Sequence, residues 1–192
     1  TDPTLDEPGL VEMLKLRARK LSRCRLFPLG ALTRGLKGEN LTEMAELTES
    51  GCVGFSQADS RITNTLTLQR ALQYAATFGY TVWLQPRDAW LGNGVAASGA
   101  VATRLGLSGV PAAAETIALF TIFELMRATG ARVHLERLSS AAGVELVRRA
   151  KAEAQASRSI PDFLIGAHAL MQCSGLITRD AGFFRDYFKG LR

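Results

Sequence analysis

Histidine is scarce in this chain: only two occur among 192 residues, His134 and His168. A hydrolytic zinc centre usually takes several histidine or carboxylate ligands that converge from different strands. Two histidines can hardly supply such a ligand set. The composition therefore argues against a histidine-rich metal centre.

Cysteine is also sparse, and long apolar runs are missing. The three cysteines, Cys24, Cys52 and Cys173, stand far apart, and none forms a C-x-x-C pair. An odd number of separated cysteines argues against a disulfide framework, so we expect buried free thiols in a reducing cytoplasm. No stretch of about 18 apolar residues occurs, so no membrane span is expected. The polar start at 1–4 predicts no signal peptide at this terminus.

The chain has no concentrated charge of one sign. Its formal net charge is +5, and no aromatic residues interleave with the basic ones as a base-stacking platform requires. Solvated helix faces explain this pattern as well as a nucleic-acid surface does. The basic residues are scattered over predicted helices, among them Lys15, Arg17, Arg19, Lys20, Arg23, Arg148, Arg149 and Lys151.

Short apolar segments alternate with longer helical segments over the first 154 residues. Strands are predicted at 25–29, 52–56, 81–85 and 132–136. Helices are predicted at 7–22, 41–50, 65–78, 112–129 and 141–154. Such alternation is typical of an α/β fold in which helical crossovers join the strands of a parallel sheet. The βα units amount either to part of a TIM barrel or to a small doubly wound sheet.

Local signals set the expected ends of these elements. Asn40 is predicted to cap the helix 41–50 with Glu43 at the capping-box position, and Gly79 and Gly130 are predicted to end two others. Residues 86–110 are expected to form a loop rich in glycine and alanine. No G-x-G-x-x-G follows the first strand, so a dinucleotide site has little support. The side chains expected to face inward from the last helix are Val144, Leu146 and Val147.

Seven motifs spread over the first 153 residues carry a family resemblance. They are FPLGALTRGLKG at 27–38, LTEM at 41–44, GCVGFS at 51–56, RALQYA at 70–75, RLGLSGVP at 104–111, AET at 114–116 and TGARVH at 129–134. With them, residues 1–153 resemble the dihydroorotase branch of the amidohydrolase superfamily. The resemblance implies a distorted TIM barrel whose strand ends hold metal ions, which activate a water that opens a cyclic amide.

The metal-binding stretches of that family are altered in this chain. Where active members carry F-S-D-D-like, H-x-E-D and H-x-x-H-x-S stretches, the resemblance places Gln57, Gln85, Arg87 and Arg137 at degenerate positions. A glutamine amide is a weak neutral ligand, and an arginine brings a permanent positive charge that repels a cation. The early H-x-H and the late aspartate of the family find no match. We therefore expect no dihydroorotase catalytic residue, no bound metal and no cofactor here.

The resemblance thus points to the inactive, dihydroorotase-like subgroup. It implies a cytoplasmic, non-catalytic protein with a structural or assembly role in pyrimidine biosynthesis. The partner would be aspartate transcarbamoylase, or further copies of the chain in a homo-oligomer. An ion pair between Glu136 and Arg137 is expected to fill the former metal pocket. His134 is expected to be an ordinary strand histidine rather than a ligand.

A second resemblance covers the C-terminal segment, which we separate as residues 155–192 from a first domain at 1–154. IPDFLIGAHA at 160–169, LITRD at 176–180 and FFRDYF at 183–188 resemble the end of a PIN-domain ribonuclease. The resemblance implies a short αβα tail in which Asp162 and Asp180 hold Mg²⁺ or Mn²⁺ for RNA cleavage. Only this alternative makes nucleic acid a partner.

Simpler interpretations of the C-terminal residues also exist. Asp162 suits a helix N-terminus after Pro161, Asp180 suits a loop, and His168 suits a core position. A third hypothesis is that the chain is a chimeric α/β folding unit with no activity, since it joins two incomplete families.

Overall fold

The computed structural model describes residues 2–21 and 25–155. The chain divides into two compact units, Thr1–Leu146 and Val147–Arg192. The C-terminal segment for which a PIN-like tail was predicted, with Asp162, His168 and Asp180, lies outside the described residues. Within the described part, no helix is long and apolar enough to cross a membrane.

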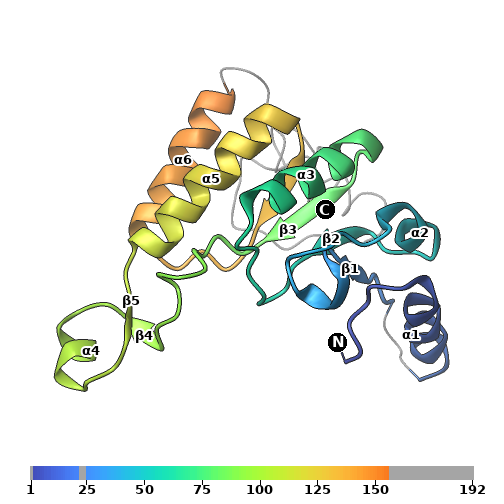
Figure 1. Ribbon diagram of the computed structural model, residues 1–192, viewed down its shortest axis with the longest axis horizontal. Helices are drawn as coiled ribbons and strands as arrows, with labels where there is room; N and C mark the ends of the chain where they lie inside the picture. The colour runs from blue at the N-terminus through green and yellow to red at the C-terminus, as the bar shows by residue number, and fades with distance from the viewer. Residues whose placement is uncertain (1, 22–24, 156–192) are drawn as a thin grey trace, which may run out of the picture. The chain divides into compact units, whose positions relative to one another are not determined.

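The first unit is built on a parallel sheet of four strands (Figure 1). They are β1 (Leu29–Ala31), β2 (Gly54–Ser56), β3 (Thr81–Leu84) and β6 (Arg132–Leu135), in the order β1-β2-β3-β6. All three pairings are parallel. A doubly wound sheet reverses its strand order at a switch point, whereas these strands follow one another in one direction. The topology is therefore compatible with part of a TIM barrel.

Three helices connect successive strands of the sheet: α2 (Met44–Glu49), α3 (Thr65–Phe78) and α5 (Ala113–Thr129). α1 (Pro8–Leu21) precedes β1, a short 3₁₀ helix (Arg34–Leu36) follows it, and α6 (Ala141–Gln155) follows β6. The predicted bounds of α3 are confirmed, because both of its ends have local caps. The Asn64 side chain accepts a hydrogen bond from the Leu66 N–H (2.9 Å), and Gly79 ends the helix with φ 71°.

The core lies on the face of the sheet that α3 covers. Alternate residues along a strand point to opposite faces, so Phe55 and Val82 are fully buried on this face. Trp83 and His134 point to the other face and are only partly buried. The largest fully buried side chains are Phe55, Leu32, Met44, Leu47, Leu72, Leu119, Val11 and Val82.

Two predicted boundaries near the first strands are wrong. β1 begins at Leu29 rather than at residue 25, and α2 begins at Met44 without a side-chain cap. The predicted cap residue Asn40 is used elsewhere, because its carbonyl accepts the Arg34 N–H at 2.9 Å. Thr42 donates its hydroxyl to the Ala31 carbonyl at 2.6 Å. These tertiary hydrogen bonds hold 40–42 extended against the end of β1, so the helix starts later.

The segment 86–110 also differs from prediction. The expected loop contains β4 (Ala96–Ala97), α4 (Ala100–Arg104) and β5 (Gly109–Val110), and β4 pairs with β5 in parallel. The pairing needs glycine, because a Cβ at Gly94 would lie 2.6 Å from the Gly109 carbonyl carbon. Val144, expected to face inward from α6, is 42% exposed.

Candidate functional site

The residues at the degenerate positions all follow the carboxyl ends of sheet strands. Gln57 follows β2, Gln85 and Arg87 follow β3, and Arg137 follows β6, next to Glu136. Because the strands are parallel, these ends meet at one edge of the sheet, which is the edge where TIM-barrel enzymes build their sites. We call it the carboxyl edge.

Gln57 is a structural residue of this edge. It is 3% exposed, and its amide oxygen accepts a hydrogen bond from the Thr33 hydroxyl at 2.9 Å. Its amide nitrogen donates to the Leu36 carbonyl at 2.9 Å. Both polar ends of Gln57 are thus used to hold the loop that follows β1.

Arg87 and Arg61 hold the turn at 88–94 by donating hydrogen bonds to its carbonyl groups. Arg87 Nη2 donates to the carbonyls of Gly92 and Gly94, the latter at 3.2 Å. Arg61 Nη2 donates to the same Gly92 carbonyl at 3.0 Å. Arg87 Nε is buried and has no acceptor among the described residues. The turn fits closely around Arg87, since a Cβ at Gly92 would lie 2.6 Å from Arg87 Cγ.

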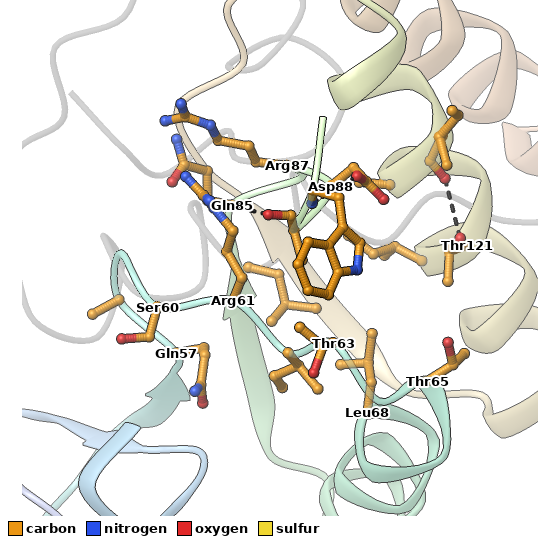
Figure 2. Close-up of a pocket in the computed structure, with 18 residues that line it drawn as sticks. Gln57, Ser60, Arg61, Thr63, Thr65, Leu68, Gln85, Arg87, Asp88 and Thr121 are labelled. Carbon is orange, nitrogen blue, oxygen red and sulfur yellow. Dashed lines mark hydrogen bonds between the residues drawn. The ribbon is translucent and has the colours of Figure 1, made fainter. Parts of the chain in front are cut away.

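A cavity of about 150 Å³ lies beside this turn (Figure 2). Its polar lining includes Gln57, Arg61, Gln85, Arg87 and Asp88, together with the hydroxyl residues Ser60, Thr63, Thr65 and Thr121. The Asp88 carboxylate accepts the N–H groups of two residues of its own turn, at 2.9 and 2.8 Å. It is therefore used locally as a turn-stabilising group.

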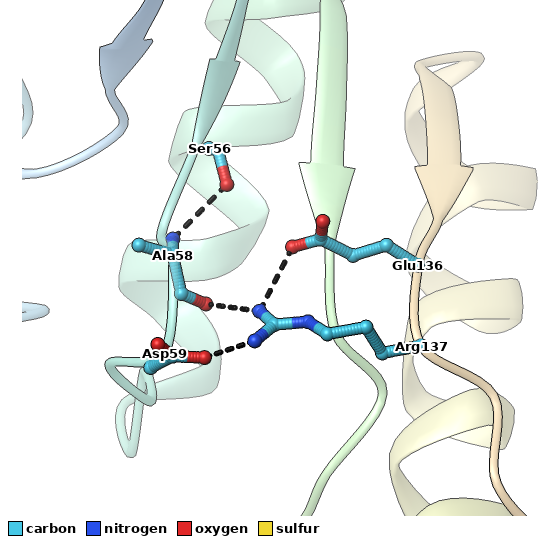
Figure 3. A network of polar contacts seen from close by, with 5 residues as sticks. All are labelled: Ser56, Ala58, Asp59, Glu136 and Arg137. Carbon is cyan, nitrogen blue, oxygen red and sulfur yellow. Dashed lines mark hydrogen bonds and ion pairs between the residues drawn. The ribbon is translucent and has the colours of Figure 1, made fainter.

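Arg137 crosses the carboxyl edge from the end of β6 (Figure 3). It contacts the Asp59 carboxylate, the Ala58 carbonyl at 3.2 Å and Glu136 Oε1 at 3.1 Å. The predicted pair with Glu136 is confirmed, whereas the contact with Asp59 was not predicted. Since β3 lies between β2 and β6, Arg137 ties together the ends of two strands that are not neighbours.

The electrostatics of this contact favour the charged guanidinium. The hydrogen bond that Arg137 donates to Asp59 raises the pKa of Arg137; burial opposes this, and Glu136 adds to it. However, the Arg137 side chain is 44% exposed, so the contact is not the fully internal pair that was expected. An ion pair with this degree of exposure contributes about 0–1 kcal/mol to stability.

Three of the four degenerate positions share a larger cavity. Gln85, Arg87 and Arg137 line a space of about 470 Å³, and Gln57 is not among its lining residues. The structure thus brings together the three positions that follow β3 and β6, and gives Gln57 to the neighbouring smaller cavity alone.

Glu115 is the residue of this region that sequence reasoning missed. It lies in the first turn of α5, is 6% exposed, and accepts four hydrogen bonds at the start of α6. These come from the N–H and hydroxyl of Ser139 (both 2.7 Å) and of Ser140 (3.1 and 2.7 Å). Burial raises the pKa of Glu115, but these hydrogen bonds together outweigh it and lower the pKa. Glycine is needed nearby, because a Cβ at Gly143 would lie 1.9 Å from Glu115 Oε1.

His134 lies within β6, away from this contact network. Its ring stacks on Trp83 of the paired strand, with ring centroids 3.9 Å apart. The pKa of His134 lies below its ordinary value, because the lowering by burial outweighs the raising by the nearby Glu136. This is the setting expected of an ordinary strand histidine.

The donor set of the carboxyl edge does not fit a divalent metal ion. Among the residues that the structure describes, no three His, Cys, Asp or Glu side chains are grouped so that they could hold one. Asp59 and Glu136 bind Arg137, and the Glu115 carboxylate binds two serines. The groups that remain are the Gln85 amide, which is a weak neutral ligand, and cationic nitrogens, which repel a metal ion.

Known proteins resemble the chain over this same region. Residues 1–142 match the family model described as Dihydro-orotase-like. The chain belongs to the dihydroorotase-like family. It is 42% identical to a dihydroorotase-like protein of Pseudomonas putida over 152 residues, and these residues make up 79% of this chain and 36% of that relative. It is 40% identical over 153 residues to a dihydroorotase of Geobacter sp. (strain M21), covering 79% of this chain and 36% of the relative.

A dihydroorotase-like protein of Pseudomonas aeruginosa is also 42% identical, over 153 residues that make up 79% of this chain and 36% of that protein. This dihydroorotase-like chain therefore spans about a third of the length of the curated relatives it matches.

Proposed function

We propose that this dihydroorotase-like chain is a non-catalytic member of its family with an assembly role in pyrimidine biosynthesis. The observation that carries the proposal is the Arg137 contact at the carboxyl edge. Its guanidinium lies between Asp59 and Glu136 and pairs with both carboxylates, which leaves a permanent positive charge at this edge. Arg87 adds a second permanent positive charge close by. Two relatives that carry the name dihydroorotase-like protein, rather than dihydroorotase, add support.

The proposed partner is aspartate transcarbamoylase, with self-association as the competing mode of assembly. The support is family membership together with apolar side chains that the chain exposes. Trp90 is 77% exposed and Val95 is 75% exposed, and both lie in the segment 88–110. Val101 and Leu105 of the same segment are also more than half exposed. Exposed apolar side chains gathered in one segment are typical of protein–protein contact sites.

The catalytic half of the proposal is tested by metal content and by turnover. The purified chain is incubated with zinc, desalted, and assayed for cyclisation of carbamoyl aspartate. We expect far less than one zinc ion per chain and no product. The dihydroorotase of Geobacter, prepared in the same way, is the positive control. Stoichiometric zinc together with product formation would refute the proposal.

The assembly half is tested separately by size-exclusion chromatography with light scattering. The chain is run alone and with aspartate transcarbamoylase. Co-elution in a defined ratio is the expected result. A Trp90→Ser variant should weaken that co-elution, whereas Leu21→Ser, an equally exposed apolar position on α1, should not. A chain that stays monomeric in both runs contradicts an assembly role.

A further inference from the structure

Arg87 carries a charge that nothing in the described part of the chain neutralises. Its Nη2 donates to two carbonyl oxygens, and none of the ion pairs found among the described residues involves it. Its Nε–H is buried without an acceptor. A buried donor of a charged group that lacks an acceptor is costly and rare in folded proteins. Nε is closed off by the turn, whereas Nη1 makes no hydrogen bond within the described residues and is not a buried atom, so Nη1 is the nitrogen that a ligand in the cavity can reach.

Gln85 presents a second polar group without a hydrogen-bond partner beside Arg87, although this one is accessible rather than buried. It lines both cavities with Arg87, and its amide makes no hydrogen bond within the described residues. The polar atoms of the Gln85 side chain are not buried, so they are accessible from the cavities. The polar ends of Arg61, Gln85 and Arg87 lie on the same side of the smaller cavity in Figure 2.

The charges that line the smaller cavity favour a negative guest. Arg61 and Arg87 contribute two positive charges, and Asp88 is the one carboxylate in its described lining. The Asp88 carboxylate is turned into its own turn, where two N–H groups bind it. Neither arginine forms an ion pair with it. The cavity therefore holds net positive charge beside the Gln85 amide. The Arg61 guanidinium contributes charge only, because its Nη atoms already donate to the carbonyls of Ala89 and Gly92 and to Asn93 Oδ1.

We propose that this cavity is an oxyanion site, in which Gln85 and Arg87, with Arg61 beside them, bind a carboxylate or phosphate group of a small molecule. The planar guanidinium matches the geometry of both groups and gives strong, charge-assisted hydrogen bonds. A volume of about 150 Å³ holds several water molecules, and hence one such group. The inference concerns ligand binding and is independent of the proposed assembly role.

The test is isothermal titration calorimetry of the full chain with inorganic phosphate and, separately, with succinate. Both are titrated at constant ionic strength in sodium chloride, so that general screening is unchanged. We expect saturable binding of one ion per chain for at least one of them, and the arm that binds identifies the group. Absence of saturable binding in both arms overturns the proposal.

Three variants locate the binding. Arg87→Gln and Gln85→Met should each weaken it, Arg87→Gln by about tenfold or more because it removes charge-assisted hydrogen bonds. Arg127→Gln is the matched control, since Arg127 is an exposed arginine on α5 that pairs with Glu124, and it should bind as the parent does. Arg87 also holds the turn, so melting temperatures are compared. Two results together count against the site. One is that Gln85→Met binds as tightly as the parent, and the other is that Arg87→Gln loses binding only together with a lowered melting temperature.

Discussion

Replacing Glu115 with glutamine tests the contact that joins α5 to the start of α6. The substitution keeps the shape of the side chain but removes its charge and one acceptor oxygen. The native carboxylate binds two backbone N–H groups and two hydroxyls, each oxygen taking one of each. In the glutamine variant, one backbone N–H faces an NH₂ group, and two donors are placed together.

The expected cost follows from which of the four partners can adapt. The serine hydroxyls can rotate to accept a hydrogen bond from the new amide. The backbone N–H groups of Ser139 and Ser140 cannot, so one of them loses its partner. A hydrogen bond to a charged group contributes about 1.5–3 kcal/mol, and a buried donor left unpaired costs a similar amount. We therefore expect Glu115→Gln to lower the free energy of unfolding by about 2–4 kcal/mol.

The assay is urea unfolding followed by tryptophan fluorescence. Both tryptophans of the chain, Trp83 and Trp90, belong to the first unit, so the signal reports on the unit that contains the contact. Glu124→Gln is the control, because Glu124 lies on the same helix but its side chain is 67% exposed in a pair with Arg127. It should cost no more than about 0.5 kcal/mol. Equal destabilisation by both variants would refute the reasoning.

The same contact predicts an acid dependence of stability. The pKa of Glu115 lies below its ordinary value of 4.5 in the folded chain. The stabilisation from this group is therefore complete above the unfolded-state pKa, and it is lost as the pH falls through the folded-state pKa. The parent should lose stability in that acidic window. Glu115→Gln should lose less over the same window, because its amide does not titrate.

Three further results are expected. Gly143→Ala should destabilise the chain by more than about 1 kcal/mol, because its Cβ would meet Glu115 Oε1 at 1.9 Å, whereas Gly9→Ala, with nothing within 4 Å, should not; equal melting temperatures would contradict this. Burial raises the pKa of Cys52 to about 11, so mass spectrometry after brief alkylation at about pH 8 should find this thiol unmodified, and rapid labelling of the native chain would show that it is accessible. If the PIN-like interpretation holds, Mn²⁺-dependent RNA cleavage should occur and disappear in Asp162→Asn; cleavage that survives the substitution, or none in the parent, counts against it.

Elements with a signal at both ends were predictable from sequence. The bounds of α3 follow from Asn64, whose side chain caps the first turn, and from Gly79, which takes the left-handed conformation that other residues avoid. Gly130 ends α5 in the same way, with φ 70°. The predicted helix 41–50 had an equally plausible signal in Asn40. The predicted start of that helix is wrong because residues 40–42 make tertiary hydrogen bonds with residues 31–34 instead.

The candidate site was predictable only in part. The sequence motifs identified Gln85, Arg87 and Arg137, and the parallel sheet brings all three to one cavity. The pair between Glu136 and Arg137 involves neighbours in sequence, so it could be expected. The contact of Arg137 with Asp59 could not, because the two residues are 78 positions apart and meet only after the strands are ordered.

The sequence by itself determined that this is a chain of parallel βα units in which amide and guanidinium side chains follow the strand ends. Such information is local: apolar periodicity sets each element, and residue type sets the charge at each strand end. Only the tertiary structure decided what those groups bind. Glu115 joins two serines 24 and 25 positions away, and the Nε–H of Arg87 is left without an acceptor in the described chain. Partners that distant are chosen by how the elements pack, which no short stretch of sequence encodes.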